Sequence, residues 1–575
     1  MLRTHLAGEL RQENIGEEVR LSGWVDTIRD HGGVKFLDLR DQSGITQIVL
    51  HDDSMLDGVN REAVVSIFGK VRLRGEETIN PKIGTGYIEV FADKLEILGA
   101  CRNMLPFEVG ESTSTREEVR LKYRFLDLRN PSLHNNIVLR AQIISFIRQQ
   151  MTGLDFIEIQ TPILTASSPE GARDYLVPSR KHKGKFYALP QAPQMFKQLL
   201  MVSGFDKYFQ IAPCFRDEDA RGDRSPGEFY QLDFEMAFAE QEDVLNVAET
   251  VMFETFSKFS DKRISPRPFR RIRYDESMLR YGSDKPDLRN PLVIFDLTEF
   301  FSKVDFPLFK GKPVRGIVAD CSGQARSFFE KSLEFATSIG MKGLGYLTLA
   351  ENDFKGPIAK FLSDEQKQEL INEHGIKAGE TLFFICDAPS MVNELAGGIR
   401  GWLGTTLGIV DTEAFEFCFI TDYPMYEYNP ETKGIDFTHN PFSMPMGGLE
   451  TLETKDPLEV YAHQYDVVCN GVELSSGAVR NHSPEIMKKA FAIAGYSEDE
   501  LEKRFGALYT AFQYGAPPHA GMAPGIDRIV MLIAGEETIR DVIAFPLNGN
   551  AQDVMLGAPG EVSEKQLRDV HISIR

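Results

Sequence analysis

The stretch that decides the fold is CFRDED (214–219), followed after a charged loop by EFYQLD (228–233). Both runs are strand-like, and the Gly and Pro in the intervening ARGDRSPG (220–227) are typical of turns, so the three segments together predict a long β-hairpin. Arg216 on one strand and Phe229 on the returning strand could bind a phosphate and stack on a base, because a guanidinium matches phosphate oxygens and an aromatic face accepts a ring. A network of surface ion pairs is the alternative interpretation.

A second glycine-rich stretch, GMAPGIDR (521–528), leads into an apolar helix. Its apolar residues recur at helical spacing and place Arg528 in the first turn. Free N–H groups and the helix dipole already favour anions there, so a cation at this position suggests an anionic ligand. A salt bridge to a carboxylate is the alternative. A third stretch, GLDFIEIQTPIL (153–164), is a weaker signal, which an edge strand stopped by proline would also explain.

The rest of the chain suggests several domains around these segments. Short alternating runs in residues 1–100 predict a small antiparallel barrel, with an OB-fold as the leading candidate. A polar stretch, GESTSTREE (110–118), indicates a hinge. Ile137, Ala141, Ile144 and Met151 predict an amphipathic helix from residue 136 onward. Strand candidates at 316–320, 345–349 and 382–386 indicate a further α+β block.

Composition limits the class of protein. The chain has 575 residues, with 42% hydrophobic and 26% charged, which is the ordinary mixture of a globular protein of three or four domains. The net charge of -21 disfavours indiscriminate binding to nucleic acid or anionic membranes, but a specific nucleic-acid site needs only local positive charge. The six cysteines are scattered, so we expect reduced thiols. The polar N-terminal sequence predicts a cytoplasmic protein without a membrane partner.

Taken in chain order, the segments 153–164, 214–233 and 521–528 resemble motifs 1, 2 and 3 of the class II aminoacyl-tRNA synthetases. Five further stretches are similar to the aspartyl-tRNA synthetases of bacterial type: RLKYRFLDLR (120–129), SPEGARDYLVPSR (168–180), QAPQMFKQLLM (191–201), GVELSSGAVR (471–480) and GAPPHAGMAPGIDR (515–528). The resemblance covers nearly the whole chain. It implies a multidomain α+β protein with an N-terminal OB-fold β-barrel, a catalytic domain built on an antiparallel sheet and an inserted α+β GAD-like domain.

The domain boundaries that follow are an OB-fold anticodon-binding domain at 1–105, a hinge at 106–135, catalytic parts at 136–284 and 412–575, and the insertion at 285–411. The resemblance also implies the activity: ATP activates L-aspartate to aspartyl-adenylate, and the aspartyl group passes to the 3′ end of a tRNA. A homodimer with motif 1 at the interface is implied as well. A catalytically inactive RNA-binding relative is the rival hypothesis, and an asparagine synthetase of related fold is a third.

The resemblance assigns roles to particular residues. Arg216 matches the arginine on the α-phosphate of ATP, and Arg528 matches the arginine on the γ-phosphate side. Glu218 and Phe229 match positions that contact adenine. Asp466 and Glu473 match the carboxylates that hold Mg²⁺ against the phosphates. The whole ATP-binding set implied by the motifs is Arg216, Asp217, Glu218, Phe229, Glu473, Gly525, Ile526, Asp527 and Arg528, with Arg216, Glu218 and Arg528 as the catalytic residues.

The implied aspartate pocket combines cations for the side-chain carboxylate with partners for the ammonium group. Lys197 and Arg480 match the cations, and Glu170 matches the ammonium partner. Gln194 and Lys197 are three residues apart on an expected helix and so share one face. His439 matches a histidine that closes over the substrate, and Arg216 also belongs to the aspartate-binding set.

Three departures from the family pattern stand out. The motif 2 loop is one residue longer than a common form and has Ser225 where glutamine is frequent. Asn440 stands where many relatives have a second histidine. The segment FPLNGNAQD (545–553) differs from the common text, so no site is assigned there.

In the barrel, Arg29, His31, Phe36 and Gln47 match residues that read the anticodon, with Phe36 stacking on a base. Residues 1–105 contain 13 Lys and Arg against 17 Asp and Glu, so recognition should depend on stacking and hydrogen bonds. His31 lies between Asp30 and Gly32, where leucine is common in strict enzymes and histidine in relaxed ones. This predicts charging of tRNA-Asn as well as tRNA-Asp, with an amidotransferase completing Asn-tRNA. A simple turn residue is the alternative interpretation of His31.

Overall fold

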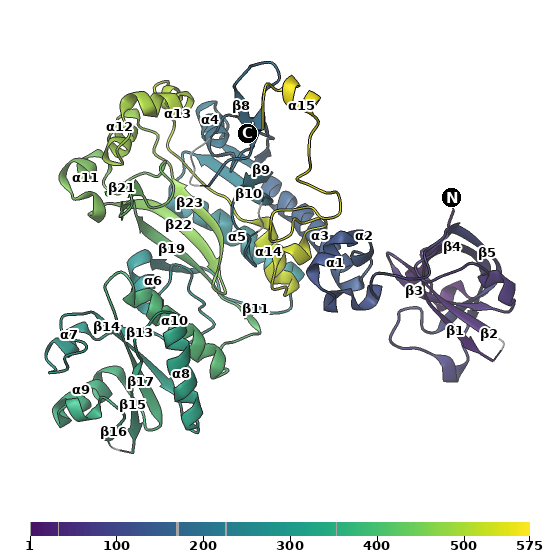
Figure 1. Ribbon diagram of the computed structural model, residues 1–575, viewed down its shortest axis with the longest axis horizontal. Helices are drawn as coiled ribbons and strands as arrows, with labels where there is room; N and C mark the ends of the chain where they lie inside the picture. Colours follow the sequence, from purple (N-terminus) through teal and green to yellow (C-terminus); the bar gives the residue numbers. More distant parts are fainter. Residues whose placement is uncertain (1, 33, 168–171, 225–226, 352, 575) are drawn as a thin grey trace. The chain divides into compact units, whose positions relative to one another are not determined.

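The computed structural model describes residues 2–32, 34–167, 172–224, 227–351 and 353–574 (Figure 1). The chain divides into two compact units, residues 1–115 and 116–575. All six cysteines are free; four are buried, and Cys101 and Cys386 are half-buried. Among the described residues, no helix is long and apolar enough to cross a membrane.

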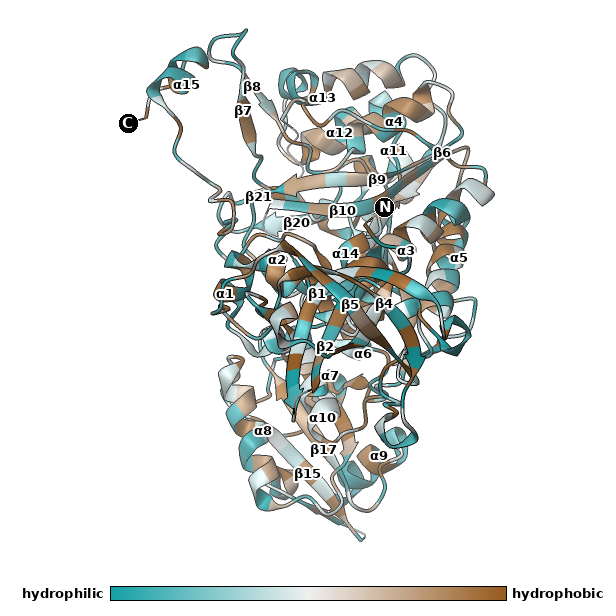
Figure 2. Ribbon diagram, turned by 90° about the vertical axis from the view of Figure 1, so that its right-hand side faces the viewer, coloured by the Kyte–Doolittle hydropathy of each residue, from teal (hydrophilic) through white to brown (hydrophobic). Residues whose placement is uncertain are grey.

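The first unit is a closed five-stranded barrel, which confirms the predicted fold of this region. The strand order is β1-β2-β3-β5-β4. The bounds are β1 (Glu18–His31), β2 (Val34–Asp41), β3 (Gly44–Leu50), β4 (Val64–Leu73) and β5 (Ile88–Gly99). Alternate residues of β1 point inward: Val19, Leu21 and Val25 are buried while their neighbours are partly exposed. Figure 2 shows this alternation of hydrophobic and hydrophilic residues along the strands, the pattern of a half-buried antiparallel strand.

The second unit is built on an eight-stranded, mostly antiparallel sheet of order β12-β19-β22-β23-β24-β10-β9-β6. Its edge pairs β12·β19 and β6·β9 are parallel. The bounds are β12 (Arg270–Arg273), β19 (Phe417–Pro424), β22 (Tyr461–Cys469), β23 (Val472–Val479), β24 (His519–Met522), β10 (Gly227–Ala237), β9 (Lys207–Arg216) and β6 (Ile157–Glu158). The predicted hairpin is β9–β10, and the weak third signal is the edge strand β6.

Helices pack on this sheet through its apolar residues. The core beside β10 includes Leu232 and Phe234 with residues of α3 (Pro131–Gly153), α5 (Gln241–Phe259) and α14 (Ile526–Ala534). The other helices of this part are α1 (Glu117–Lys122), α2 (Arg124–Asp127), α4 (Gln194–Val202), α6 (Tyr274–Tyr281), α11 (Gly448–Thr454), α12 (Pro484–Ile493), α13 (Glu498–Phe512) and α15 (Glu564–Asp569). Short strand pairs complete it: β7 (Leu176–Pro178) with β8 (Phe186–Ala188), β11 (Arg263–Ile264) with β18 (Ala414–Phe415), and β20 (Tyr426–Asn429) with β21 (Gly434–Phe437).

Helix α3 corrects one detail of the sequence interpretation. It begins at Pro131, because Asn130 caps its N-terminus by accepting a hydrogen bond from the backbone of Ser132. Its buried stripe includes Ile143 and Ile147, whereas the predicted stripe included Ala141, which is exposed. The helix is apolar on more than one side, so spacing alone did not identify the packed face.

A second, five-stranded sheet lies within the predicted insertion, in the order β13-β14-β17-β15-β16. Its strands are β13 (Ile294–Asp296), β14 (Val314–Asp320), β15 (Gly345–Ala350), β16 (Asp353–Lys355) and β17 (Glu380–Cys386), with α7 (Thr298–Ser302), α8 (Arg326–Ser338), α9 (Asp364–His374) and α10 (Val392–Thr406). Successive residues of β17 enter two different cores, Phe383 and Ile385 with α8 and α10, Leu382 and Phe384 with α7 and α9. Coverage on both faces explains the continuous apolar run of this strand.

Candidate active site

A cavity of about 710 Å³ opens on the face of the large sheet opposite the core of α3, α5 and α14. Strand β10 explains the placement: Leu232 and Phe234 point into the core, so the alternate residues Gln231 and Asp233 point into the cavity. Most predicted site residues line it: Gln194, Lys197, Arg216, Glu218, Phe229, His439, Asp466, Glu473, Arg480, Gly525, Asp527 and Arg528.

One end of the cavity holds a buried network of alternating charges. Lys197 donates from Nζ to Asp233 Oδ1 at 2.8 Å and lies 3.3 Å from Glu235 Oε2. Arg480 donates from Nε to Glu235 Oε1 at 2.8 Å. Its Nη1 is buried without a hydrogen-bond partner among the described residues. Because a buried guanidinium normally uses all its N–H groups, this nitrogen is suited to an anionic ligand.

The charged groups of this network shift one another's pKa values. Burial raises the pKa of Asp233 in spite of Lys197. Burial alone would also raise the pKa of Glu235, but Arg480 and Lys197 outweigh it and hold that pKa below its usual value. In turn Glu235 raises the pKa of Arg480, although burial opposes this. The two cations and two anions of the network cancel, so it has no net charge. A ligand that brings a carboxylate into it must also bring a positive charge, such as its own ammonium group.

Glu235 can occupy its position only because residue 521 is a glycine. Strand β24 pairs with β10 so that Glu235 lies opposite Gly521. A Cβ at position 521 would clash with the Glu235 carboxylate and with the carbonyl oxygen of Phe234. The counter-ion of Arg480 therefore depends on the missing side chain of a neighbouring strand.

A relay of hydrogen bonds sets the orientation of Gln194. The Nδ1 of His519 donates to the carbonyl of Pro517 at 2.8 Å, so its Nε2 accepts from the amide nitrogen of Gln198 at 3.0 Å. The oxygen of Gln198 then accepts from Nε2 of Gln194 at 3.1 Å. Burial lowers the pKa of His519 and so favours this neutral form. The relay leaves the amide oxygen of Gln194 as an acceptor for a ligand.

The phosphate-binding candidates lie on the hairpin β9–β10 and on α14. The guanidinium of Arg216 lies 4.9 Å from the ring centre of Phe229, across the hairpin, and no described residue forms an ion pair with it. Glu218 pairs with Arg224 at 2.6 Å. Arg528 lies in the first turn of α14, as predicted, and donates to the carbonyl oxygens of Glu473 and Asp223 at 2.6 and 3.1 Å.

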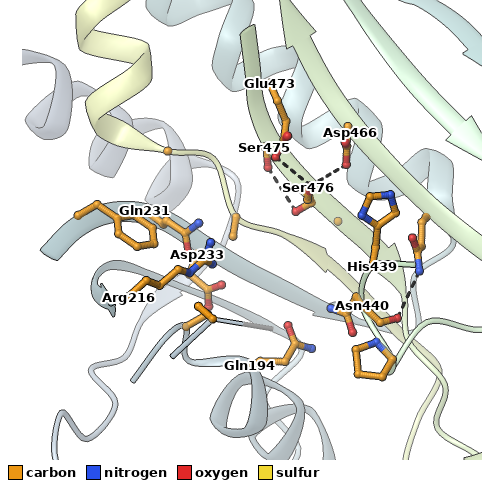
Figure 3. Close-up of a pocket in the computed structure, with 18 of the residues that line it drawn as sticks. Gln194, Arg216, Gln231, Asp233, His439, Asn440, Asp466, Glu473, Ser475 and Ser476 are labelled. Carbon is orange, nitrogen blue, oxygen red and sulfur yellow. Dashed lines mark hydrogen bonds between the residues drawn. The ribbon is translucent and has the colours of Figure 1, made fainter. Parts of the chain in front are cut away.

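Two carboxylates face each other beside these cations. Figure 3 shows Asp466, Ser476 and Glu473 together on one side of the cavity, away from Gln194, Arg216 and Asp233. Ser476 donates to Asp466 Oδ1 at 2.7 Å and lies 3.3 Å from Glu473 Oε1. Tyr423 donates to the other oxygen of Asp466 at 2.8 Å.

The charge balance of this pair fits a cation. Burial and the nearby Glu473 raise the pKa of Asp466 to about 8. Burial would raise the pKa of Glu473 too, but Lys285 and Arg528 hold it low. Asp466 has no ion-pair partner in the described part of the chain. Two hard oxygen ligands, of which Asp466 has no cationic partner among the described residues, suit Mg²⁺, which keeps several waters and takes further oxygens from phosphates.

His439 lines the cavity on the same side as Asp466 (Figure 3). Its ring packs edge-on against Tyr423 with centroids 4.9 Å apart. Burial lowers the pKa of His439, although several carboxylates oppose the shift. The neighbouring Asn440 accepts from the backbone N–H of Phe442 at 2.9 Å and shapes the turn.

Two predicted residues, Asp217 and Ile526, do not line the cavity, and a third, Asp527, lines it with its carboxylate already engaged. Asp217 lies outside the lining and pairs loosely with Arg173 at 3.7 Å. Ile526 is buried in the core, so its side chain cannot contact ATP. Asp527 lines the cavity, but its carboxylate accepts from the backbone of Tyr230 and pairs with Arg140. Glu170 and Ser225 lie outside the described residues.

The sequence interpretation missed the anionic half of the charged network. Gln231, Asp233 and Glu235 alternate along β10, so the period of a strand could have placed all three on one face with the cations. Gln198 and His519 gave no such signal, because they are 321 residues apart and meet only in the fold.

The barrel brings the four predicted anticodon residues together. Arg29 pairs across the strands with Phe36 and donates twice to Asp38, at 2.6 and 2.8 Å. One of its nitrogens lies 3.3 Å from the oxygen of Gln47. The ring of His31 packs edge-on against Phe36 at 5.8 Å. A partly exposed aromatic ring beside hydrogen-bonding groups is a typical surface for single-stranded bases.

The barrel and the mainly antiparallel sheet with its arginines define a class of protein. Residues 116–549 match the family described as class II tRNA synthetases (D, K and N), and residues 19–98 match the OB-fold nucleic acid binding domain. The chain belongs to the class II tRNA synthetases of this group.

Particular relatives are similar along their whole length. A protein of Rickettsia bellii (strain OSU 85-389) is 58% identical, with 100% of this chain and 98% of the relative covered. One of Rickettsia prowazekii (strain Madrid E) is 54% identical, with 100% and 97% covered. Both are named aspartate–tRNA(Asp/Asn) ligase.

Solved structures with the same fold are more distant. A putative aspartyl-tRNA synthetase from Leishmania major Friedlin has a TM-score of 0.59 at 18% identity, covering 95% of this chain and 94% of the other. The asparaginyl-tRNA synthetase of Pyrococcus horikoshii with asparaginyl-adenylate has a TM-score of 0.58 at 19% identity, covering 95% and 98%. At this identity the likeness supports the fold alone.

Proposed function

We propose that the chain is an aspartate–tRNA ligase that converts L-aspartate and ATP to aspartyl-adenylate and then transfers the aspartyl group to the 3′ end of tRNA-Asp. The observation that carries the proposal is the buried Nη1 of Arg480, which has no partner within the described residues and lies in the cavity with Lys197. Such a donor suits a side-chain carboxylate. The names of the Rickettsia relatives agree with this substrate.

The residues act by positioning and by charge. Arg216 stabilises the charge that builds on the α-phosphate during attack by the aspartate carboxylate, and Arg528 binds the far end of the triphosphate. The adenine packs against Phe229 near Glu218. Asp466 and Glu473 would hold Mg²⁺, which when bound would offset the negative charge of the phosphates. No protein nucleophile is needed, because the substrate carboxylate attacks directly.

Selection against asparagine follows from the same network. An asparagine side chain turns N–H donors toward the cations Lys197 and Arg480 and leaves the buried Nη1 of Arg480 without an anionic acceptor. Leaving a buried charge unpaired is strongly unfavourable, so a site made for a carboxylate rejects its neutral isostere. The ammonium group of the substrate is bound by Asp233 and the oxygen of Gln194, together with Glu170.

We extend the proposal to tRNA-Asn, since the two anticodons, GUC and GUU, differ only at the third base. His31 can donate or accept through its ring and so accommodates either pyrimidine, whereas leucine cannot. The names of the relatives include both tRNAs. The product on tRNA-Asn requires an amidotransferase in the cytoplasm, where the enzyme acts as a homodimer with motif 1 at the interface.

The test is aspartate-dependent ATP–pyrophosphate exchange, followed by aminoacylation of purified tRNA-Asp and tRNA-Asn. We expect exchange with aspartate but not asparagine, and charging of both tRNAs. Absence of exchange in folded protein would favour an inactive RNA-binding relative. Charging of tRNA-Asp alone would establish a strict enzyme and refute the role given to His31.

A further inference from the structure

Lys285 contacts one of the predicted metal carboxylates from outside the cavity. Its Nζ lies 2.9 Å from Oε2 of Glu473, whereas Nη1 of Arg528 is 3.9 Å from Oε1. Lys285 is not among the described residues that line the cavity. Its charge therefore reaches a ligand through Glu473.

The two carboxylate oxygens of Glu473 have different surroundings as a result. Oε2 is occupied by the ammonium of Lys285. Oε1 lies 3.3 Å from Ser476, whose hydroxyl donates to Asp466. Oε1 is thus the oxygen that can share one cation with Asp466. A carboxylate held by an ammonium group on one side has a fixed direction and less charge to give a metal.

Lys285 stands at the start of the predicted insertion, and the segment that follows it is held by helix α10 of the same insertion. Arg400 of α10, which is 4% exposed, donates to the backbone carbonyls of Leu292 at 2.7 Å, Asp287 at 2.9 Å and Asn290 at 2.7 Å. Asn290 donates back to the carbonyl of Arg400 at 2.8 Å. A planar guanidinium that binds three carbonyls fixes the path of the chain that begins two residues after Lys285.

The start of the segment is fixed against the same helix. Gly282 ends α6 with φ +70, a left-handed conformation that favours glycine. A Cβ there would clash with the backbone of Asn393 and Gly397 in α10. Lys285 therefore lies in a short connection with contacts to α10 on both sides.

We propose that Lys285 is a positioning residue that lowers the affinity of Glu473 for a divalent cation in the absence of ATP, and that Arg400 holds it there. When both are ionised, as binding of a cation requires, Asp466 and Glu473 supply two negative charges, and Lys285 offsets one of them. A single net charge binds a divalent cation weakly until phosphate oxygens add theirs. The part of this proposal that concerns ATP rests on the proposed function. Through the contact between Lys285 and Glu473, the insertion would influence when the cation binds.

The direct test measures binding of Mn²⁺, as a visible divalent probe, to the full chain without nucleotide by electron paramagnetic resonance. Lys285→Met should bind Mn²⁺ about tenfold or more tightly, because the ammonium group that offsets the charge of Glu473 is lost. Lys285→Arg keeps the cation and should behave like the unaltered chain. Unchanged or weaker Mn²⁺ binding by Lys285→Met would overturn the proposal. If Lys285 only held the Glu473 side chain in place, its loss would leave that side chain disordered and would not strengthen binding.

The role of the insertion needs a matched pair of variants. Arg400→Lys should shift Mn²⁺ binding toward the value of Lys285→Met. Arg315→Lys is the control, because Arg315 is also buried in the insertion but bonds to Asp296 and Asn393 and not to the segment of Lys285. Equal effects of both changes would refute the link through Arg400.

A second measurement follows pyrophosphate exchange as Mg²⁺ is varied. Lys285→Met should reach half-maximal exchange at lower Mg²⁺, while its KM for aspartate stays unchanged. An altered KM for aspartate would contradict a role confined to the metal carboxylate. Failure of exchange in the unaltered chain would refute the proposed function, and the Mn²⁺ measurement would still decide the role of Lys285.

Discussion

Replacing Arg480 by leucine should abolish productive aspartate binding. The change removes the unpartnered Nη1 and also the partner of Glu235, which is fully buried and receives a 2.8 Å hydrogen bond from Arg480. Breaking a buried ion pair costs about 3–5 kcal/mol. If the substrate carboxylate loses a contact of similar strength, kcat/KM for aspartate falls by roughly two to three and a half orders of magnitude.

The assay is pyrophosphate exchange over a range of aspartate concentrations, with the KM for ATP as internal control. In the proposed function ATP binds through Arg216 and α14, so its KM should change little. Near-normal activation of aspartate by Arg480→Leu would refute the assignment of the pocket.

A second variant separates binding from stability. Arg480→Leu also leaves Glu235 with Lys197 as its remaining cation, so the free energy of unfolding should fall. Adding Glu235→Gln removes the carboxylate that has lost one of its two cations and should restore much of the stability, measured by denaturant unfolding, but not the activity. Recovery of aspartate activation by the double variant would mean that Arg480 supports Glu235 without touching the substrate.

The remaining predictions concern three other side chains. Arg216→Ala should lower pyrophosphate exchange by orders of magnitude with little effect on tRNA affinity, because its partner is the transition-state phosphate; surviving exchange with collapsed tRNA binding would place Arg216 on the RNA surface. His31→Leu should reduce kcat/KM for tRNA-Asn more than for tRNA-Asp, and equal losses would argue against a role in reading the third base. Burial lowers the pKa of His519 below its ordinary 6.5, so the unfolded chain takes up the proton first and the stability present above about pH 6.5 is lost as the pH falls. The unfolding free energy should therefore depend less on pH between about 7.5 and 5.5 in His519→Asn than in the unaltered chain. Identical pH dependence of the two proteins would exclude His519 as a source of it.

The sequence predicted the parts of the site that depend on local pattern. Alternation and turn residues identified the hairpin that carries Arg216 and Phe229, and helical spacing placed Arg528 in a first turn. The resemblance identified Lys197 and Arg480 as substrate-binding residues. Composition and spacing alone would not have distinguished them from other charged residues of the chain. These residues belong to short continuous motifs, so their identification did not require the tertiary fold.

The partners of these residues could not be predicted in the same way. The contact of Lys285 with Glu473 and the relay from His519 to Gln194 join segments that are distant in sequence and close only after folding. The packed face of α3 was also missed, because its apolar residues do not form a single stripe and the neighbouring helices decide which side is buried.

Gly521 has a consequence for how this sequence can vary. It contributes no side chain to any ligand, yet every substitution there would push against the Glu235 carboxylate and so misalign Arg480. In a saturation mutagenesis library, position 521 should tolerate as little change as a residue that touches aspartate. Evolution of a new amino-acid specificity on this scaffold would meet the same barrier, since the strand spacing must be rebuilt before the charge pattern of the pocket can change.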